Sequence, residues 1–390
     1  MNYTFSFSLL ILILTVACNS QNDDAQDLPR LEEAGAASVR VNENFKAIEL
    51  DSFSGAKYEI KGITNENEYF FFNNYNQSIY VYDLKSEPQK PKHIIKVPLD
   101  ESINFNLVSD LFYHNADSIF IWDDNNSFGD RPELFLINSQ GEVVDTFKVS
   151  DGNEGYPSKA TTSETAIGQS MIYHDGKIIL LSSITKYTKE ENWYPIILFD
   201  LASRSTSLHG TYPQSFYIGK FGFRRWMSNF CLVPELNQVV VSFPYEPNLF
   251  YLNLEDTSWN ELGFHSDLVA TPRPFDETRQ TSLEHLLSNS WYLGLSYDKA
   301  NQLIWRTAEV SKESSPPYSG RGEFQSFLIN PRSLKYWVLP GVDWLKTTFY
   351  HTTDGPYQMV QKHEELGLAP EDFVIFNPLT LEIVDLETEN

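Results

Sequence analysis

The sequence feature that most constrains the fold is a strand ending that occurs six times. The six segments are IYVYDLKSE, LFLINSQGE, ILFDLASRS, FYLNLEDTS, FLINPRSLK and VIFNPLTLE. In each, an apolar run stops at an Asp or Asn, at positions 83, 138, 200, 253, 330 and 377. Such a residue at the first position of a type I turn accepts a hydrogen bond from the backbone two residues on. We therefore expect a hairpin corner, followed by another strand, at each position.

Two further β-rich runs precede each corner. The second strands of the units are EYFFFNN, DSIFIWDD, GKIILLSS, QVVVSFPY, QLIWRTAE and YQMVQKH. With a mean period of about 59 residues, four antiparallel strands per unit predict an all-β fold, a β-propeller. We expect six four-stranded blades, with seven as the alternative. The early segment SVRVNENFKAIEL is an extra strand candidate that would pair with the last blade, and residues 276–289 are a short helix candidate.

The N-terminus resembles that of a bacterial lipoprotein. The stretch MNYTFSFSLLILILTVAC has an apolar core too short to span a membrane, and it ends at Cys18. We expect a signal peptide over residues 1–18, lipidation of Cys18, a flexible acidic tether over 19–37 and one propeller domain over 38–390. Asp residues just past Cys18 resemble the export signal of surface lipoproteins of Bacteroidota. Ordinary secretion and an uncleaved anchor are the alternatives.

The net charge limits the classes of partner that we expect, and the cysteine content limits the disulfides that can form. With a net charge of -24, the chain repels phosphate backbones, so nucleic acid is not an expected partner. If Cys18 carries lipid, only Cys231 remains, so no intramolecular disulfide can form. The apolar neighbours of Cys231 indicate a buried, inert thiol.

Ligands are expected on the rim formed by the connections from second to third strands and by the connections between blades. These segments are long and unequal, and they concentrate arginines and aromatic residues, which are common at recognition sites. The candidate binding residues are Asp123, Asp124, Arg131, Trp193, Tyr194, Arg224, Arg225, Trp226, Arg273, Trp291 and Arg321.

No motif names a reaction or a cofactor. His174-Asp175 lies in a turn from first to second strand, and His114, His351 and Asp298 occupy the same place in other units, so we interpret them as structural features of the blades. The loop beginning at Asp123 fails as an EF-hand, because its sixth and twelfth positions are Phe128 and Leu134. The sequence has no HExxH, CxxC or GxSxG motif, and we expect neither metal nor cofactor.

The Cys-terminated leader and the recurrent YVYDL, LFLIN and FLINP corners resemble a family of Bacteroidota lipoproteins that share a domain of unknown function. The resemblance implies a propeller-like fold and a location in the cell envelope, anchored by lipid, in the outer membrane with possible surface exposure. It implies no catalytic residues. The sequence favours a protein that binds a protein or glycan partner. The alternative is a glycan hydrolase or lyase with carboxylates in the loop-rich rim.

Overall fold

The structure is a computed structural model, and it describes residues 28–42, 44–50, 60–64, 66–86, 90–100, 108–123, 134–149, 171–181, 194–213, 228–269, 289–310, 323–340, 348–360 and 373–385. Its described part is built of β-strands and one short 3-10 helix, Pro234–Leu236. None of the described residues forms a helix long and apolar enough to cross a membrane. The predicted helix at 276–289 and the lipidation site Cys18 lie outside this part, apart from residue 289.

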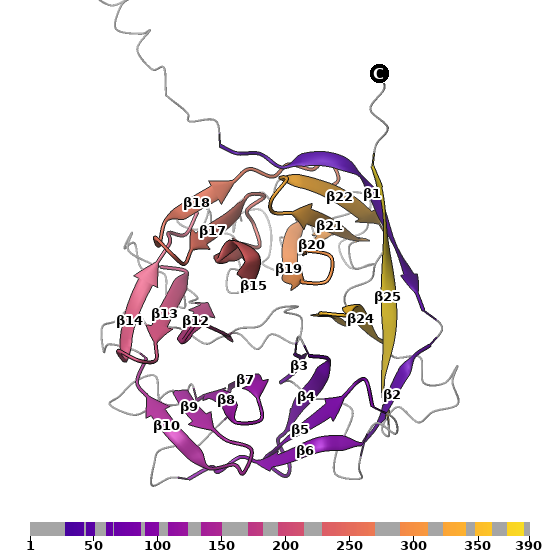
Figure 1. The fold of residues 1–390 in the computed structure, drawn as a ribbon. Coiled ribbons are helices and arrows are strands. Elements are labelled where there is room, and N and C mark those ends of the chain that lie inside the picture. The colour runs from indigo at the N-terminus through magenta and orange to yellow at the C-terminus, as the bar shows by residue number, and fades with distance from the viewer. Residues whose placement is uncertain are drawn as a thin grey trace, which may run out of the picture.

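Four sheets each contain four strands in chain order, and they stand around a common centre (Figure 1). The first has β3 (Lys61–Ile63), β4 (Glu68–Asn73), β5 (Ser78–Asp83) and β6 (Pro91–Lys96). The second has β7 (Asp110–Asn115), β8 (Ser118–Trp122), β9 (Leu134–Ile137) and β10 (Val143–Phe147). The third has β11 (Met171–His174), β12 (Lys177–Leu181), β13 (Ile196–Asp200) and β14 (Ser205–His209). The fourth has β15 (Asn229–Val233), β16 (Gln238–Ser242), β17 (Leu249–Asn253) and β18 (Trp259–Leu262).

The remaining strands form one nine-stranded sheet. Its order is β19 (Trp291–Asp298), β20 (Leu303–Val310), β21 (Glu323–Asn330), β22 (Lys335–Pro340), β1 (Glu32–Val41), β25 (Phe373–Asp385), β24 (Gly355–Val360) and β23 (Thr348–Thr352). The ninth strand, β2 (Lys46–Glu49), pairs with β25. The arrangement is propeller-like, as predicted from the repeats.

Burial explains why the second and third strands are apolar runs. All six residues of β4 are buried, because this strand has a neighbouring sheet on each face. The outermost strand β6 instead alternates between buried or half-buried and exposed residues. The described residues contain six apolar clusters: five lie between successive sheets around the ring, including one that joins β24 and β25 to the first sheet, and the other lies mainly within the nine-stranded sheet, where β19–β22 meet β1 and β25.

Five of the six predicted corners are confirmed. The Oδ1 atoms of Asp83, Asn138, Asn253 and Asn330 accept hydrogen bonds from the backbone N–H two residues on, at 2.8–3.1 Å. Asp200 Oδ1 accepts the N–H of Ser203 at 2.8 Å. The sixth is wrong, because β25 runs through Asn377 and Pro378 without a turn. There the N-terminal segment supplies the neighbouring strand that a hairpin would otherwise provide.

The N-terminal segment pairs with the last strand, as predicted, but it begins earlier than expected. Antiparallel pairing joins Gly35–Val41 to β25, and Lys46–Glu49 continues along the same strand. Glu32–Ala36 also pairs in parallel with β22. The predicted tether over 19–37 is therefore wrong for residues 32–37, which are part of β1. Buried Gly35 and Ala37 are small enough for this strand to pack closely on its neighbours.

Candidate functional site

Most candidate residues of the predicted binding rim lie outside the described residues: Asp124, Arg131, Trp193, Arg224, Arg225, Trp226, Arg273 and Arg321. Of the three others, Tyr194 is 38% exposed and precedes β13 at that rim. Asp123 is fully buried at the end of β8. Trp291 is 2% exposed and packs in the apolar cluster with Trp305 and Trp337, so its ring is part of the core and offers no surface to a partner.

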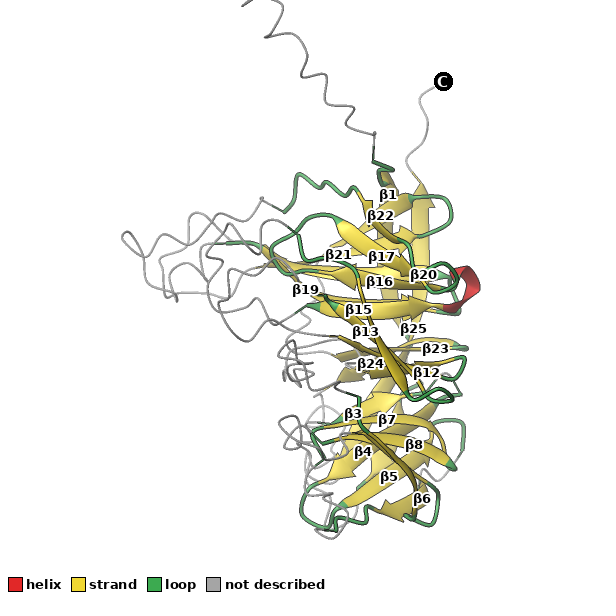
Figure 2. Ribbon diagram, turned by 90° about the vertical axis from the view of Figure 1, so that its left-hand side faces the viewer, coloured by secondary structure: helices red, strands yellow, loops and turns green. Residues whose placement is uncertain are grey.

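The described part of this rim is asymmetric. Strands β19, β20 and β21 have eight residues each, whereas the first three strands of the four-stranded sheets have three to six. The extra length lies at the end opposite the tight turns that join β19 to β20 and β21 to β22. At this end Val310 pairs with Glu323. At about 3.3 Å per residue, two or three extra residues extend this sheet by roughly 7–10 Å beyond the described strands of its neighbours. Figure 2 shows this projection at β19 and β21.

Next to the projection, a buried arginine holds a loop of the same rim. Arg306, in β20, is fully buried, and its guanidinium donates to the backbone carbonyls of Glu246 at 2.8 Å and of Pro247. Its Nε donates to Ser242 Oγ at 3.0 Å. The ring of Tyr292 lies 3.5 Å from its Cζ atom. Burial lowers the pKa of Arg306 to about 10, so it stays charged at neutral pH.

Arg306 therefore fixes the connection between β16 and β17, which sequence reasoning did not single out. Backbone carbonyls satisfy its donors, and an aromatic face covers it. The signal was present in QLIWRTAE, where one basic residue interrupts a strand expected to be buried.

The opposite rim is formed by the tight turns, and its predicted structural role is consistent with the contacts there. The His174 Nε2 atom lies 3.3 Å from Asn237 Oδ1 of the next sheet, and the His114 ring lies 4.7 Å from the ring of Tyr173. His351 is buried, with its Nδ1 atom 3.9 Å from Asp298 Oδ2. In the part of the chain that the structure describes, no three His, Cys, Asp or Glu side chains gather as metal ligands.

Cys231 is buried, as predicted. Burial raises the pKa of its thiol, which keeps the sulfur protonated and unreactive at neutral pH.

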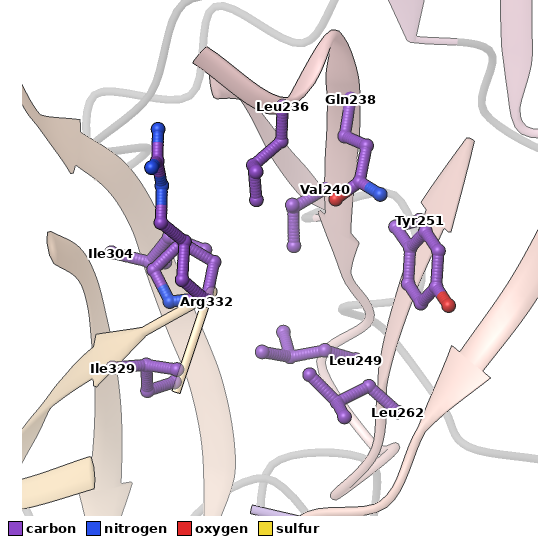
Figure 3. A pocket seen from close by; sticks show the side chains of 10 residues that line it. Leu236, Gln238, Val240, Leu249, Tyr251, Leu262, Ile304, Ile329 and Arg332 are labelled. Carbon is purple, nitrogen blue, oxygen red and sulfur yellow. The ribbon is translucent and has the colours of Figure 1, made fainter. Parts of the chain in front are cut away.

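A pocket of about 350 Å³ lies between the β15–β18 sheet and the strands β20 and β21 (Figure 3). Aliphatic side chains of both sheets form its walls, and Gln238, Tyr251 and Arg332 are its polar lining residues. Its opening is on the tight-turn rim, since Leu236 and Arg332 belong to turns there. Sequence reasoning missed this pocket because its walls read as ordinary core strands.

Comparison with known proteins gives the family. The sequence profile described as "Domain of unknown function (DUF4221)" matches residues 45–329, which is more than half of the chain. The chain belongs to the DUF4221 family. The predicted resemblance to a family with a domain of unknown function and a propeller-like fold is thus confirmed.

Many solved structures are similar to this DUF4221 chain, and two of them have the following similarity. A DUF4221 member from Bacteroides vulgatus has a TM-score of 0.68 at 17% identity, covering 90% of this chain and 100% of that one. A putative exported protein from Bacteroides fragilis has a TM-score of 0.53 at 9% identity, covering 88% and 96%. At these identities the likeness concerns the fold. No curated protein has a sequence that matches this chain.

Proposed function

We propose that this DUF4221 protein is an exported, lipid-anchored binding protein, whose propeller presents its loop-rich rim to a protein or glycan partner. The observation that carries the proposal is the asymmetry of that rim. In the described residues one sheet projects beyond the strands of its neighbours, and Arg306 holds the adjacent loop in a fixed conformation. A fixed, uneven surface suits recognition, because little conformational freedom is lost when a partner binds.

The proposed ring has six blades. In this proposal the nine-stranded sheet comprises two blades, β19–β22 and β23–β24–β25–β2, and β1 joins them at their outer edges. In the described residues, five apolar clusters between successive sheets and a sixth within the nine-stranded sheet support this count, as does the pairing of β2 with β25. Pairing between the two chain ends closes a ring without a free edge at the junction.

Export and anchoring are proposed from the leader that ends at Cys18. The fold likeness to a protein described as a putative exported protein supports export. Lipidation would place the propeller at the envelope, in the outer membrane and with possible surface exposure.

The test is capture of a partner by the lipidated protein from its own membranes. We expect capture to be lost with the rim variant Arg224→Ala/Arg225→Ala and to persist with Lys177→Ala, which removes a charge from the tight-turn rim. Turnover of a glycan panel without any captured partner would instead support a hydrolase or lyase. Equal capture by both variants would contradict binding through the loop-rich rim.

A further inference from the structure

The C-terminal half of β25 is an open sheet edge. Strands β24 and β2 pair with opposite edges of its first half, because both are opposite Ile375 and Phe376. Pairing with β24 stops at Pro378, whereas pairing with β1 continues to Asp385. In the described residues, Leu381–Asp385 therefore have β1 on one edge and no strand on the other. Figure 1 shows this end of β25 running past β24 on the outside of the ring.

One hydrogen bond gives the direction of the backbone groups along this segment. The Asn42 N–H donates to the carbonyl of Pro378 at 2.9 Å, so this carbonyl points toward the N-terminal segment. Successive residues of a strand direct their N–H and C=O groups to opposite edges, and β1 and β25 pair in a regular register. Even-numbered residues of β25 from position 378 on therefore face β1. The groups that face the open edge belong to Leu381, Ile383 and Asp385.

Most other outer strands of the ring have features that hinder the addition of a strand. A proline begins β6, a bulge interrupts β10, the N-terminal chain meets the end of β18 at Gly263, and β1 covers β22. In the described residues, β6, β10 and β14 have one exposed aliphatic residue each. Strand β25 has two in succession, Ile383 at 41% and Val384 at 66% exposure, one on each face. Open backbone groups beside exposed aliphatic side chains suit the addition of a strand.

The charge of this segment indicates the kind of strand that it accepts. Four acidic residues and no basic residue occupy positions 382–389, and the whole chain has a net charge of -24. A second copy of this chain would place the same acidic segment at the edge, and like charges oppose that pairing. Arg40 already pairs with Glu382 at 3.2 Å across β1 and β25. Basic side chains on an added strand would repeat this pairing on the open side.

We propose that the open edge at Leu381–Asp385 binds an extended, basic segment of a partner protein, which adds one strand to the sheet. Main-chain hydrogen bonds to the open edge hold the segment. Its apolar side chains lie on the face of Leu381, which packs against the apolar cluster of Trp337, and its basic side chains lie on the face of Glu382. The edge is separate from the loop-rich rim, so this site is independent of the function proposed above.

The test is fluorescence anisotropy of a labelled peptide with the full chain. The peptide has about seven residues, an ordinary strand length, with lysine and valine in alternation. Its counterpart has glutamate in place of lysine, and we expect the lysine peptide to bind at least about tenfold more tightly. Ile383→Pro removes the central N–H of the open edge and should weaken the lysine peptide at least about tenfold. The matched control Ile383→Val keeps this N–H and should bind like the parent.

A second measurement separates strand addition from charge attraction alone. With the lysine peptide bound, the amide hydrogens of Leu381 and Ile383 should exchange more slowly with solvent. The amide hydrogen of Val384 faces β1, so its exchange should change less. The urea unfolding midpoint shows whether Ile383→Pro keeps the fold. Ile383→Lys keeps the N–H and tests the charge independently, because it should weaken the lysine peptide and strengthen the glutamate peptide.

Several outcomes would overturn the proposal. These are absence of peptide binding to the folded chain, equal affinity for the two peptides, parent-like affinity in folded Ile383→Pro, and unchanged exchange at Leu381 and Ile383. A concentration-dependent dimer in sedimentation that Ile383→Pro abolishes would assign the edge to a second copy instead. None of these outcomes bears on partner capture by the loop-rich rim.

Discussion

At the scale of single residues, two buried ionisable groups stand out. Arg306 is a buried cation whose described contacts are carbonyls, a hydroxyl and aromatic rings. His351 is buried beside Trp305, and among the described residues neither of its ring nitrogens has a hydrogen-bond partner. The first group organises a loop of the rim, and the burial of the second predicts that stability depends on pH.

Replacing Arg306 should destabilise the fold. In Arg306→Leu the carbonyls of Glu246 and Pro247 lose their donors, and we expect the free energy of unfolding to fall by about 3 kcal/mol. Urea denaturation measures the change. Arg332→Leu, at an exposed position, should change it by less than about 0.5 kcal/mol. An unchanged unfolding midpoint in Arg306→Leu would argue against a stabilising role for the hydrogen bonds from Arg306 to this loop.

The burial of His351 predicts acid sensitivity. Burial lowers its pKa to about 4, from an ordinary value of 6.5, although the nearby Asp298 opposes this shift. Between these values the unfolded chain binds a proton that the folded chain does not, so stability falls as the pH drops from 6.5 to 4. The expected slope is up to about 1.4 kcal/mol per pH unit.

The measurement is the free energy of unfolding in urea at a series of pH values. His351→Phe should lose this component of the slope while other titrations continue to act on both proteins. Parallel pH curves for the parent and the variant would refute the assignment.

At the scale of elements, the six corner motifs are alike in sequence and differ in structure. Five begin turns, and the sixth lies within the continuous strand β25. The difference is not in the motif: FLINP turns at Asn330, whereas VIFNP does not turn at Asn377. Pairing of β25 with β1 and β2 keeps that segment extended.

The two kinds of asparagine should respond differently to the same substitution. Asn253→Ala removes the acceptor of the 2.8 Å hydrogen bond from Glu255 N–H, and we expect a loss of about 1 kcal/mol. Asn377→Ala removes no turn bond and should change the free energy of unfolding by less than about 0.5 kcal/mol. Chemical denaturation of both variants measures the two changes. Equal losses in the free energy of unfolding would contradict the distinction between the turn asparagine and the strand asparagine.

Strand β1 pairs with one strand of each of the last two blades of the proposed ring, β22 and β25. Its Ala37 is 5% exposed and packs with Trp337 and Leu379, whereas the preceding Ala36 is exposed. Alternation along one strand thus separates a core position from a solvent position.

Ala37→Asp should therefore be far more harmful than Ala36→Asp. The first places a carboxylate without a partner in an apolar cluster, and we expect a loss of at least about 3 kcal/mol. The second leaves the new charge in water, with a loss below about 1 kcal/mol. Thermal unfolding of the two variants under one buffer compares them. Similar unfolding temperatures would mean that β1 is not packed as described.

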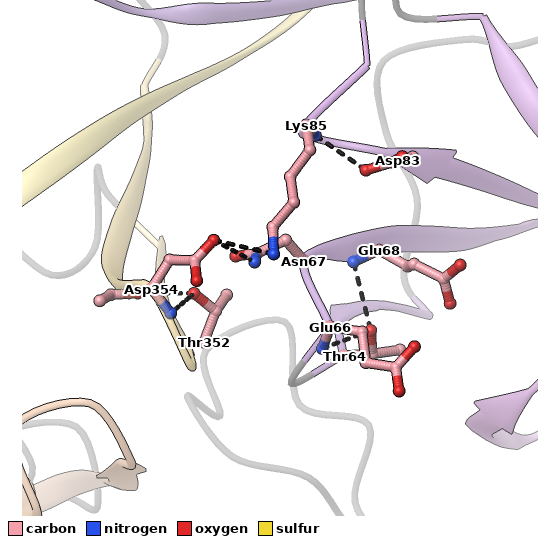
Figure 4. Close-up of polar contacts among 9 residues, drawn as sticks. Thr64, Glu66, Asn67, Glu68, Asp83, Lys85, Thr352 and Asp354 are labelled. Atoms are coloured by element: carbon pink, nitrogen blue, oxygen red, sulfur yellow. Dashed lines mark hydrogen bonds and ion pairs between the residues drawn. The ribbon is translucent and has the colours of Figure 1, made fainter.

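At the scale of the whole molecule, polar side chains join the first sheet to the turn between β23 and β24 of the nine-stranded sheet. Asp354, in the turn between β23 and β24, accepts a hydrogen bond from Asn67 Nδ2 at 2.7 Å and pairs with Lys85 Nζ at 3.0 Å (Figure 4). The hydrogen bond with Asp354 raises the pKa of Lys85. The ion pair is exposed, so it orients the junction more than it stabilises it, whereas the hydrogen bond comes from the buried Asn67 side chain.

A covalent link at the strand junction should stabilise the ring. Ser38 and Glu382 are exposed partners across β1 and β25, a spacing that a disulfide can bridge. In oxidised Ser38→Cys/Glu382→Cys we expect the free energy of unfolding to rise by up to about 5 kcal/mol, because the link closes a loop around nearly the whole ring. Urea denaturation of the oxidised and reduced forms measures the gain. Coincident curves would show that the junction stays closed during unfolding.

The sequence by itself determined the strand repeats, the five turns and the location of the extra N-terminal strand against the last blade. These follow from local chemistry, since Asp and Asn bond their own backbone and a strand buried on both faces must be apolar. Only the tertiary structure decided that Asn377 does not turn, that β1 reaches back to Glu32, that Arg306 clamps a rim loop and that a pocket lies between two sheets. Each of these depends on the register and the contacts of segments that are far apart in the chain, which local sequence patterns do not specify.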